Sequence, residues 1–195
     1  MTVLFMEHFG SFPVMDSDVH GSPRPDLAML VGARVRRARV DRGLSLGSVA
    51  ATAGIGKGSL SEIEHGQRNP TLSTLYALAR ALGTPLSHLL DDRPGAQVAS
   101  PGIVARLLDV RQEADATVEV FALTLTPGAA HRSDGHGPGV SEQVLVTSGR
   151  VRVGTEGDPM EVGVGELASF AADMPHSYEA LDAPAAAVNV IRTPR

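Results

Sequence analysis

The spacing of hydrophobic residues separates a helical part of the chain from a strand-rich part. Between residues 26 and 90, apolar residues recur at steps of three and four, as in Val31, Val35 and Ala38, which is the period of a helix with one buried face. Gly43, Ser45 and Thr71 stand where helix ends and N-caps are expected. The pattern predicts five helices, over residues 27–41, 46–53, 57–65, 72–82 and 85–90.

Beyond residue 102, short runs rich in β-branched residues alternate with Gly and Pro turns. They predict strands over residues 103–108, 117–125, 143–146, 150–153, 167–170 and 186–191. Six short strands at this spacing favour a sandwich or barrel. We therefore expect a two-domain α+β protein, with a flexible arm at 1–25, an all-α five-helix domain at 26–90, a Pro/Gly-interrupted linker at 91–102 and an all-β domain at 103–195.

The net charge of −5 hides an asymmetry between the two domains. Residues 26–90 carry eight Lys and Arg against four Asp and Glu, whereas residues 101–195 carry seven against thirteen. The basic segment suits phosphate, and the acidic one favours a cationic or zwitterionic ligand. The absence of cysteine excludes disulfides and thiolate zinc sites. With neither a secretory signal nor a membrane-spanning apolar run, a cytoplasmic protein without a membrane partner is expected.

The second and third predicted helices, joined by a turn at Gly54, form a helix-turn-helix. The stretch from residue 45 to 90 resembles the phage-repressor-like (XRE-type) helix-turn-helix family, most specifically in the run LSEIEHGQRNPT at residues 60–71. The resemblance implies that the third helix enters the major groove of double-stranded operator DNA. It also implies an ion pair between Arg39 and Glu64 that ties the first helix to the third.

The family's DNA contacts carry over residue by residue. Base readers would be Lys57, Gly58, Ser59, Ser61 and Glu62. Phosphate contacts would come from Ser45, Arg68 and Asn69. Two positions depart from the family pattern, because Leu46 replaces a phosphate-binding glutamine and Gly58 offers no side chain.

The second domain resembles a single cupin, a small jelly-roll barrel. Glu142 followed by Gly149 matches the first cupin motif, and Gly165, Phe170 and His176 match the second. The resemblance implies one divalent metal (Zn, Ni or Fe) held by His136, Glu142 and His176, with a fourth ligand from Asp134 or His131. Asp134 stands in a histidine slot and Ala180 in an asparagine slot, so the motif is altered.

Three interpretations of the second domain remain open. It holds a metal, or it holds an effector without metal, or it is a structural barrel that only dimerises. An effector pocket would draw its aromatic surface from Phe121, Phe170 and Tyr178.

Together these features predict a transcriptional regulator and not an enzyme: a homodimer that binds an operator and senses a small-molecule effector. The first alternative is a metal-dependent cupin enzyme, an isomerase or dioxygenase, fused to a DNA-binding domain. The second is an antitoxin or scaffolding protein that binds DNA only within a complex.

Overall fold

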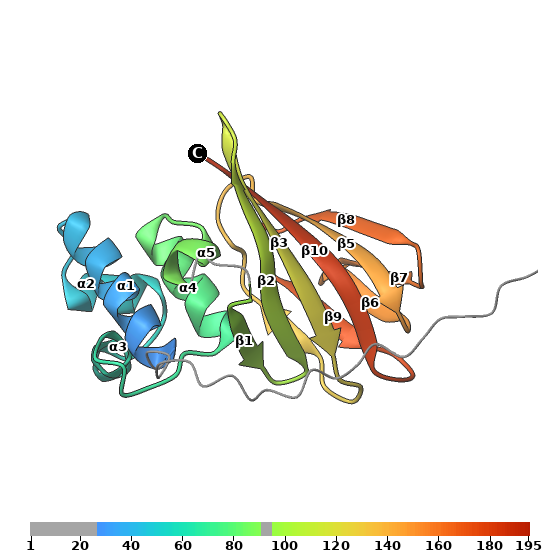
Figure 1. Cartoon of the computed structure of the whole chain (residues 1–195), viewed down its shortest axis with the longest axis horizontal. Helices are drawn as coiled ribbons and strands as arrows, with labels where there is room; N and C mark the ends of the chain where they lie inside the picture. Colours follow the sequence, from blue (N-terminus) through green and yellow to red (C-terminus); the bar gives the residue numbers. More distant parts are fainter. Residues whose placement is uncertain (1–26, 91–94) are drawn as a thin grey trace, which may run out of the picture.

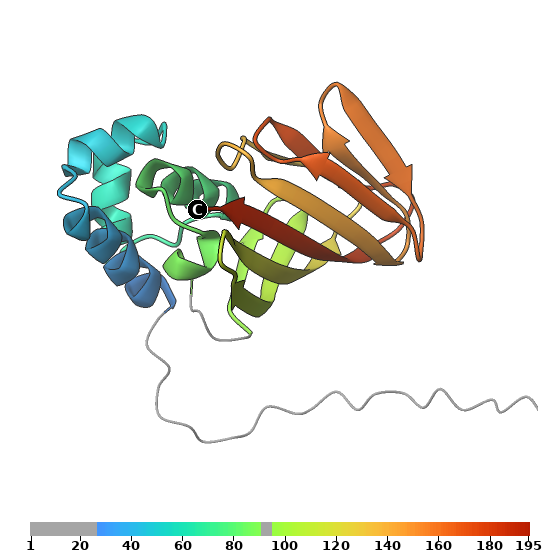
Figure 2. The same ribbon diagram turned by 90° about the horizontal axis from the view of Figure 1, so that it is seen from above.

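The computed structural model describes residues 27–90 and 95–195, which form a helical domain beside a β-sandwich (Figures 1 and 2). The expected arm, 1–25, and residues 91–94 of the expected linker lie outside the described residues. All five predicted helices are confirmed to within one residue at each end. They are α1 (Leu27–Asp41), α2 (Leu46–Thr52), α3 (Lys57–Glu64), α4 (Leu72–Leu82) and α5 (Leu86–Leu89).

The helix ends follow the capping chemistry of the sequence. Ser45 accepts a hydrogen bond from the Ser48 backbone N–H at 3.0 Å, and Thr71 accepts one from Thr74 at 3.2 Å. Each cap satisfies an N–H group that the first turn of a helix leaves without a partner. The short helices α2 and α4 therefore begin at defined residues.

The helices α1 and α3 cross at close range and are joined by a nearly buried ion pair. A Cβ at Gly32 would lie 2.1 Å from the Ile63 carbonyl oxygen, so only glycine permits this approach. Near the crossing, Arg39 Nε and Nη2 donate to the two carboxylate oxygens of Glu64 at 2.7 and 2.8 Å. The predicted Arg39–Glu64 pair is confirmed, and it sets the orientation of α3 on the domain.

The sandwich consists of two antiparallel sheets. One contains, in spatial order, β1 (Gln97–Ser100), β2 (Ile103–Gln112), β3 (Ala116–Leu125), β10 (Ala185–Pro194), β5 (Ser141–Ser148) and β8 (Leu167–Ala171). The other contains β4 (His131–Ser133), β9 (His176–Ala180), β6 (Val151–Thr155) and β7 (Asp158–Val162). The six predicted strands are all present. Sequence periodicity missed β1, β4, β7 and β9, and β1 occupies residues that were expected to belong to the linker.

Alternation along the strands decides which side chains enter the sandwich. In β5, Glu142, Val144 and Val146 are buried while Gln143 and Leu145 are exposed. Successive side chains of a strand point to opposite faces, so a glutamate in phase with two valines must point inward. A carboxylate is thereby placed in the core.

The helical domain meets the sandwich through α4 and α5 (Figure 2). The Ser87 backbone N–H donates to the buried carboxylate of Glu119 on β3 at 2.5 Å, and Arg80 donates to the Gly135 carbonyl at 3.0 Å. The two domains therefore share specific polar contacts. None of the helices within the described ranges has the length and apolarity needed to cross a bilayer.

We predict that Glu64→Ala lowers the free energy of unfolding by about 3–5 kcal/mol, because it leaves the Arg39 charge nearly buried without its partner. Urea denaturation followed by circular dichroism measures this loss. The matched control is Asp41→Ala, which removes the exposed pair with Arg37 and should cost less than about 1 kcal/mol. Equal losses in the two variants would contradict the prediction.

Candidate functional site

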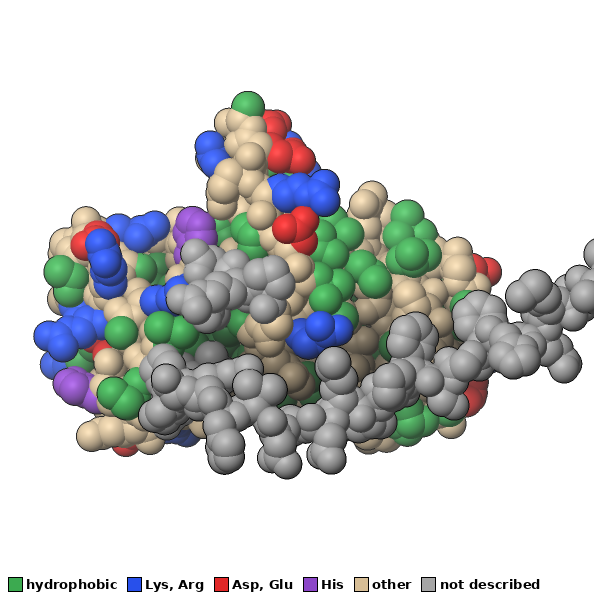
Figure 3. Space-filling model, in the orientation of Figure 1, with side chains coloured by type: hydrophobic (Ala, Val, Ile, Leu, Met, Phe, Trp, Pro, Cys, Tyr) green, Lys and Arg blue, Asp and Glu red, His purple; other side chains and the backbone are tan. Residues whose placement is uncertain are grey.

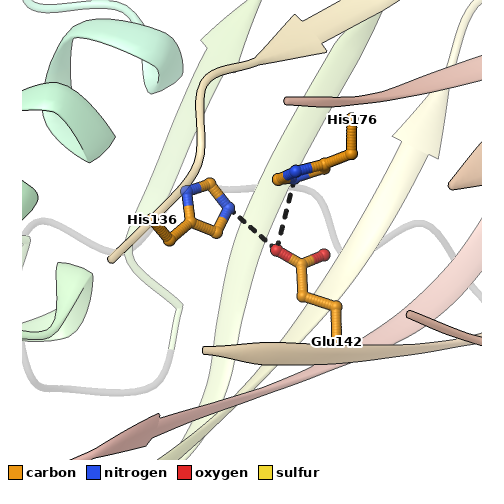
Figure 4. A group of neighbouring side chains, drawn as sticks. All are labelled: His136, Glu142 and His176. Carbon is orange, nitrogen blue, oxygen red and sulfur yellow. Dashed lines mark ion pairs between the residues drawn. The ribbon is translucent and has the colours of Figure 1, made fainter. Parts of the chain in front are cut away.

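Three of the predicted metal ligands meet inside the sandwich (Figure 4). Glu142 lies on β5, His136 on the loop that precedes it, and His176 at the start of β9. Their ligand atoms all lie within 4.8 Å of one another. Glu142 Oε1 is 2.8 Å from His136 Nε2 and 3.6 Å from His176 Nε2. Residues 40 positions apart in the sequence thus converge on one carboxylate oxygen.

The second oxygen of Glu142 is held by neighbouring strands. The Tyr178 hydroxyl donates to Oε2, and the Asn189 side-chain amide donates to the same atom at 2.9 Å. Asn189 was not among the predicted site residues. It supplies an amide from β10, whereas the cupin motif places one at the position of Ala180. Its one sequence signal is that it interrupts an otherwise apolar strand, AAAVNVI.

The protonation states suit metal binding. His176 Nδ1 donates to the Met174 carbonyl at 2.9 Å, which leaves the lone pair of Nε2 facing Glu142. Burial lowers the pKa of His176, against the opposing effect of the Glu142 charge. Burial would by itself raise the pKa of Glu142, but the contact with His136 and the surrounding charges and hydroxyl lower it to about 2. A neutral imidazole and an ionised carboxylate are the forms that coordinate metals.

Two buried polar atoms at the centre of this cluster are incompletely satisfied. Within the described part of the chain, His176 Nε2 makes no hydrogen bond, and Glu142 Oε1 has only the 2.8 Å contact with His136 Nε2, which is not of regular hydrogen-bond geometry. Buried polar atoms without partners cost free energy unless a water or an ion satisfies them. Two imidazoles and one carboxylate are ligands that Zn²⁺, Ni²⁺ and Fe²⁺ accept. The residues present therefore fit a divalent metal of this group.

The two residues expected to offer a fourth ligand do not join the cluster. Asp134 is 74% exposed, and its nearest described cation is Arg80, at 4.0 Å. His131 is buried and hydrogen-bonds Ser133 Oγ at 3.1 Å. Burial lowers the pKa of His131 to about 4, so this side chain is neutral. The cluster found among the described residues has three ligands.

The aromatic residues expected in an effector pocket surround the cluster. Phe121 and Tyr178 are buried, and Phe170 is half-buried with its ring centroid 5.4 Å from that of His176. None of the three lines the cavity beside His136 that lies between the two domains. Phe170 and Tyr178 lie against His176, and Phe121 is buried on β3 opposite Asn189.

A tyrosine from the helical domain also reaches this site. Tyr76, on α4, stacks on the His136 ring with 3.8 Å between ring centroids and 16° between planes. Sequence reasoning missed Tyr76, because a helical pattern assigns a residue to a face without naming the neighbour that it meets. The stack joins the candidate metal centre directly to the helix-turn-helix domain.

The expected DNA contacts lie on the helical domain, over which Lys and Arg side chains are seen in Figure 3. Lys57, Gly58 and Glu62 are exposed on α3, while Ser59 and Ser61 are half-buried. Arg68 and Asn69 are exposed just beyond α3. Arg68 Nη1 donates to Ser59 Oγ at 3.1 Å and lies 3.3 Å from Glu62 Oε2. The Ser45 side chain caps α2. These side chains form a polar surface around α3 and the N-terminus of α2.

Comparison with known proteins agrees with this description. The HTH_3 model, described as helix-turn-helix, matches residues 35–89. The HTH-type transcriptional regulator SutR of Escherichia coli K12 is 29% identical over 78% of this chain and 88% of its own length. The uncharacterized HTH-type transcriptional regulator y4dJ of Sinorhizobium fredii is 45% identical over 33% of this chain and 80% of its own length.

A solved structure extends the likeness to both domains. The HTH_3 family transcriptional regulator from Vibrio cholerae superposes with a TM-score of 0.74 and 27% identity, covering 87% of this chain and 98% of that one. The two antiparallel sheets described above form a cupin-like β-sandwich, which is the second domain. The helix-turn-helix match and the relatives that carry it show that the chain belongs to the HTH_3 (XRE) family of helix-turn-helix transcriptional regulators.

Proposed function

We propose that this regulator binds its operator as a homodimer through α3 and senses a small-molecule effector, with or without a metal, through its sandwich. An effector that binds two arrangements of the dimer unequally shifts their populations and thereby changes DNA affinity. The observation that carries the sensing role is the stack of Tyr76 on His136. A purely structural sandwich would not need a polar cluster in direct contact with the DNA-binding domain.

In this proposal the metal is held by His136, Glu142 and His176. A divalent ion there would supply a Lewis-acid centre for an oxygen or nitrogen donor of the effector. The chain's own residues orient the ligands. Asn189 and Tyr178 hold one oxygen of Glu142 so that the other faces the histidines, and the Met174 carbonyl sets the tautomer of His176.

The proposed DNA contacts divide into two kinds. Lys57 and Glu62 project from α3 to read base edges, with Gly58, Ser59 and Ser61 beside them. Ser45, Arg68 and Asn69 flank this helix and contact phosphates, which position the domain. Closed two-fold dimers are the commonest assembly, so two half-sites about 10 bp apart are expected in the operator.

The metal is tested by isothermal titration of the metal-free protein with Zn²⁺ and Ni²⁺, and with Fe²⁺ under anaerobic conditions. We predict one site per chain that His136→Ala combined with His176→Ala abolishes, because two of its three ligands are gone. His65→Ala is the matched control, since His65 is exposed on the helical domain and lies outside the cluster. Unchanged binding in the double variant, or no stoichiometric binding to the wild type, would reject the metal.

DNA readout is tested on operators selected from a random-sequence library. Lys57→Ala should relax specificity at one base pair, by about 1–3 kcal/mol. Arg68→Ala should instead weaken binding to all sequences alike and lower the salt dependence by about one counterion. Arg106→Ala, on the exposed face of β2, is the control and should bind as the wild type does. A selected site without two half-sites would contradict the dimer.

Coupling between the domains is tested by titrating the selected operator with and without Zn²⁺. We predict that Zn²⁺ changes the DNA affinity of the wild type and that Tyr76→Ala removes the change, because the ring against His136 is lost. Tyr76→Phe keeps the ring and should keep the response. A zinc response that survives in Tyr76→Ala, with metal affinity intact, would show that the signal does not pass through this stack.

A further inference from the structure

A cleft of about 440 Å³ lies between the two domains. On the helical side it is bounded by Arg42, the C-terminal end of α4 and the turn into α5. On the sandwich side it is bounded by the ends of β2 and β10 and by the loop from His136 to Val140. We refer to this feature as the interdomain cleft. Its volume falls in the range of small-molecule sites.

The polar lining of the interdomain cleft is basic. It includes Arg42, Arg80 and Arg195 together with His88 and His136, and none of its lining residues is an Asp or Glu. The acidic balance of the sandwich as a whole therefore does not describe this cleft. A ligand in this cleft would face positively charged side chains, so the cleft favours an anion. The acidic composition of the sandwich domain, by contrast, favours a cationic ligand.

Two arginines of the cleft, Arg42 and Arg80, have no carboxylate oxygen closer than 4.0 Å within the described residues. Arg42 donates only to main-chain carbonyls, those of Ala38 at 3.1 Å and Gly83 at 3.3 Å. Arg80 donates to the Gly135 carbonyl at 3.0 Å, and the exposed Asp134, outside the lining, is 4.0 Å away. Guanidinium groups with donors to spare recognise carboxylates and other oxyanions.

The remaining lining is largely apolar. Ala79 and Pro85 contribute from the helical domain, and Pro138, Val140 and Pro194 from the sandwich. A cleft with an apolar surface and a few convergent cations suits an amphiphilic molecule better than a bare inorganic anion. The lining is therefore complementary to a ligand with an anionic group at one end and an apolar body at the other.

We propose that the interdomain cleft binds a small organic anion, whose acidic group pairs with Arg42 and Arg80 and whose apolar body lies against the prolines and Val140. Such a ligand touches both domains and reaches His136. The assignment of this anion as the effector rests on the proposed function. The binding of the anion in the cleft does not. The site is separate from the sandwich interior around Phe121, Phe170 and Tyr178.

The test uses the full chain and the probe 1-anilinonaphthalene-8-sulfonate, an anion with an apolar aromatic body, followed by its fluorescence. One probe should bind per chain and be displaced by hexanoate but not by hexylamine or hexanamide, which share the same hydrocarbon length. Arg42→Gln combined with Arg80→Gln should weaken probe binding by about tenfold or more, because both charged donors are lost. Displacement by hexylamine as effective as that by hexanoate would overturn the proposal.

The matched control is Arg106→Gln combined with Arg111→Gln, which removes two arginines of β2 that do not line the cleft. It should bind the probe as the wild type does. A second variant, Thr193→Trp, keeps every charge and fills the cleft from β10, so it should also lose the probe. Thermal melting confirms that each variant is folded. Undiminished probe binding in folded Thr193→Trp, or in the folded cleft double variant, would overturn the site.

Titration of the operator with and without hexanoate tests whether anion binding in the cleft changes DNA affinity. A change in DNA affinity that disappears in Thr193→Trp supports the effector assignment. Probe binding in the cleft with no effect on DNA affinity would refute that assignment and leave the anion site standing. Failure of the wild type to bind any selected operator would instead refute the proposed function.

Discussion

A single buried carboxylate, that of Glu142, fixes the arrangement of the side chains in the candidate site of the sandwich. Glu142 is fully buried, and a charge in that position is stable only if other groups replace the water that it lost. Tyr178 and Asn189 donate to one oxygen, and the other faces two imidazoles. These partners come from β9, β10 and the loop before β5, so three segments of the sandwich are constrained by one side chain.

The same constraint extends into the helical domain. His136 is held between Glu142 on one side and the stacked ring of Tyr76 on the other. Nearby, the buried Glu119 of β3 accepts the Ser87 N–H of α5. Burial raises the pKa of Glu119, and the hydrogen bond that the Ser87 backbone N–H donates to the carboxylate opposes this effect. Two inward-pointing carboxylates of the sandwich therefore lie next to the surface on which α4 and α5 rest.

The candidate metal cluster and the interdomain cleft share His136 and yet differ in charge. The cluster is acidic at its centre, where one oxygen of the buried Glu142 faces the two imidazoles. The cleft is basic and lies between domains, and two of its arginines, Arg42 and Arg80, donate to main-chain carbonyls. A divalent cation and an organic anion are complementary to these two environments. Both proposed sites lie next to α4, through Tyr76 in the first case and Arg80 in the second.

The helices, the caps at Ser45 and Thr71, the Arg39–Glu64 pair and the identities of His136, Glu142 and His176 were all predictable from the sequence. Each depends on local periodicity or on resemblance to a family motif, and both can be recognised without knowledge of the fold. The strands β1, β4, β7 and β9 were missed because short strands with mixed burial carry little periodic signal. Asn189, Tyr76 and the basic cleft were decided only by the tertiary structure. Their roles come from partners that lie far away in sequence, across a sheet or across the domain interface, and no local pattern encodes which distant side chain a residue will meet.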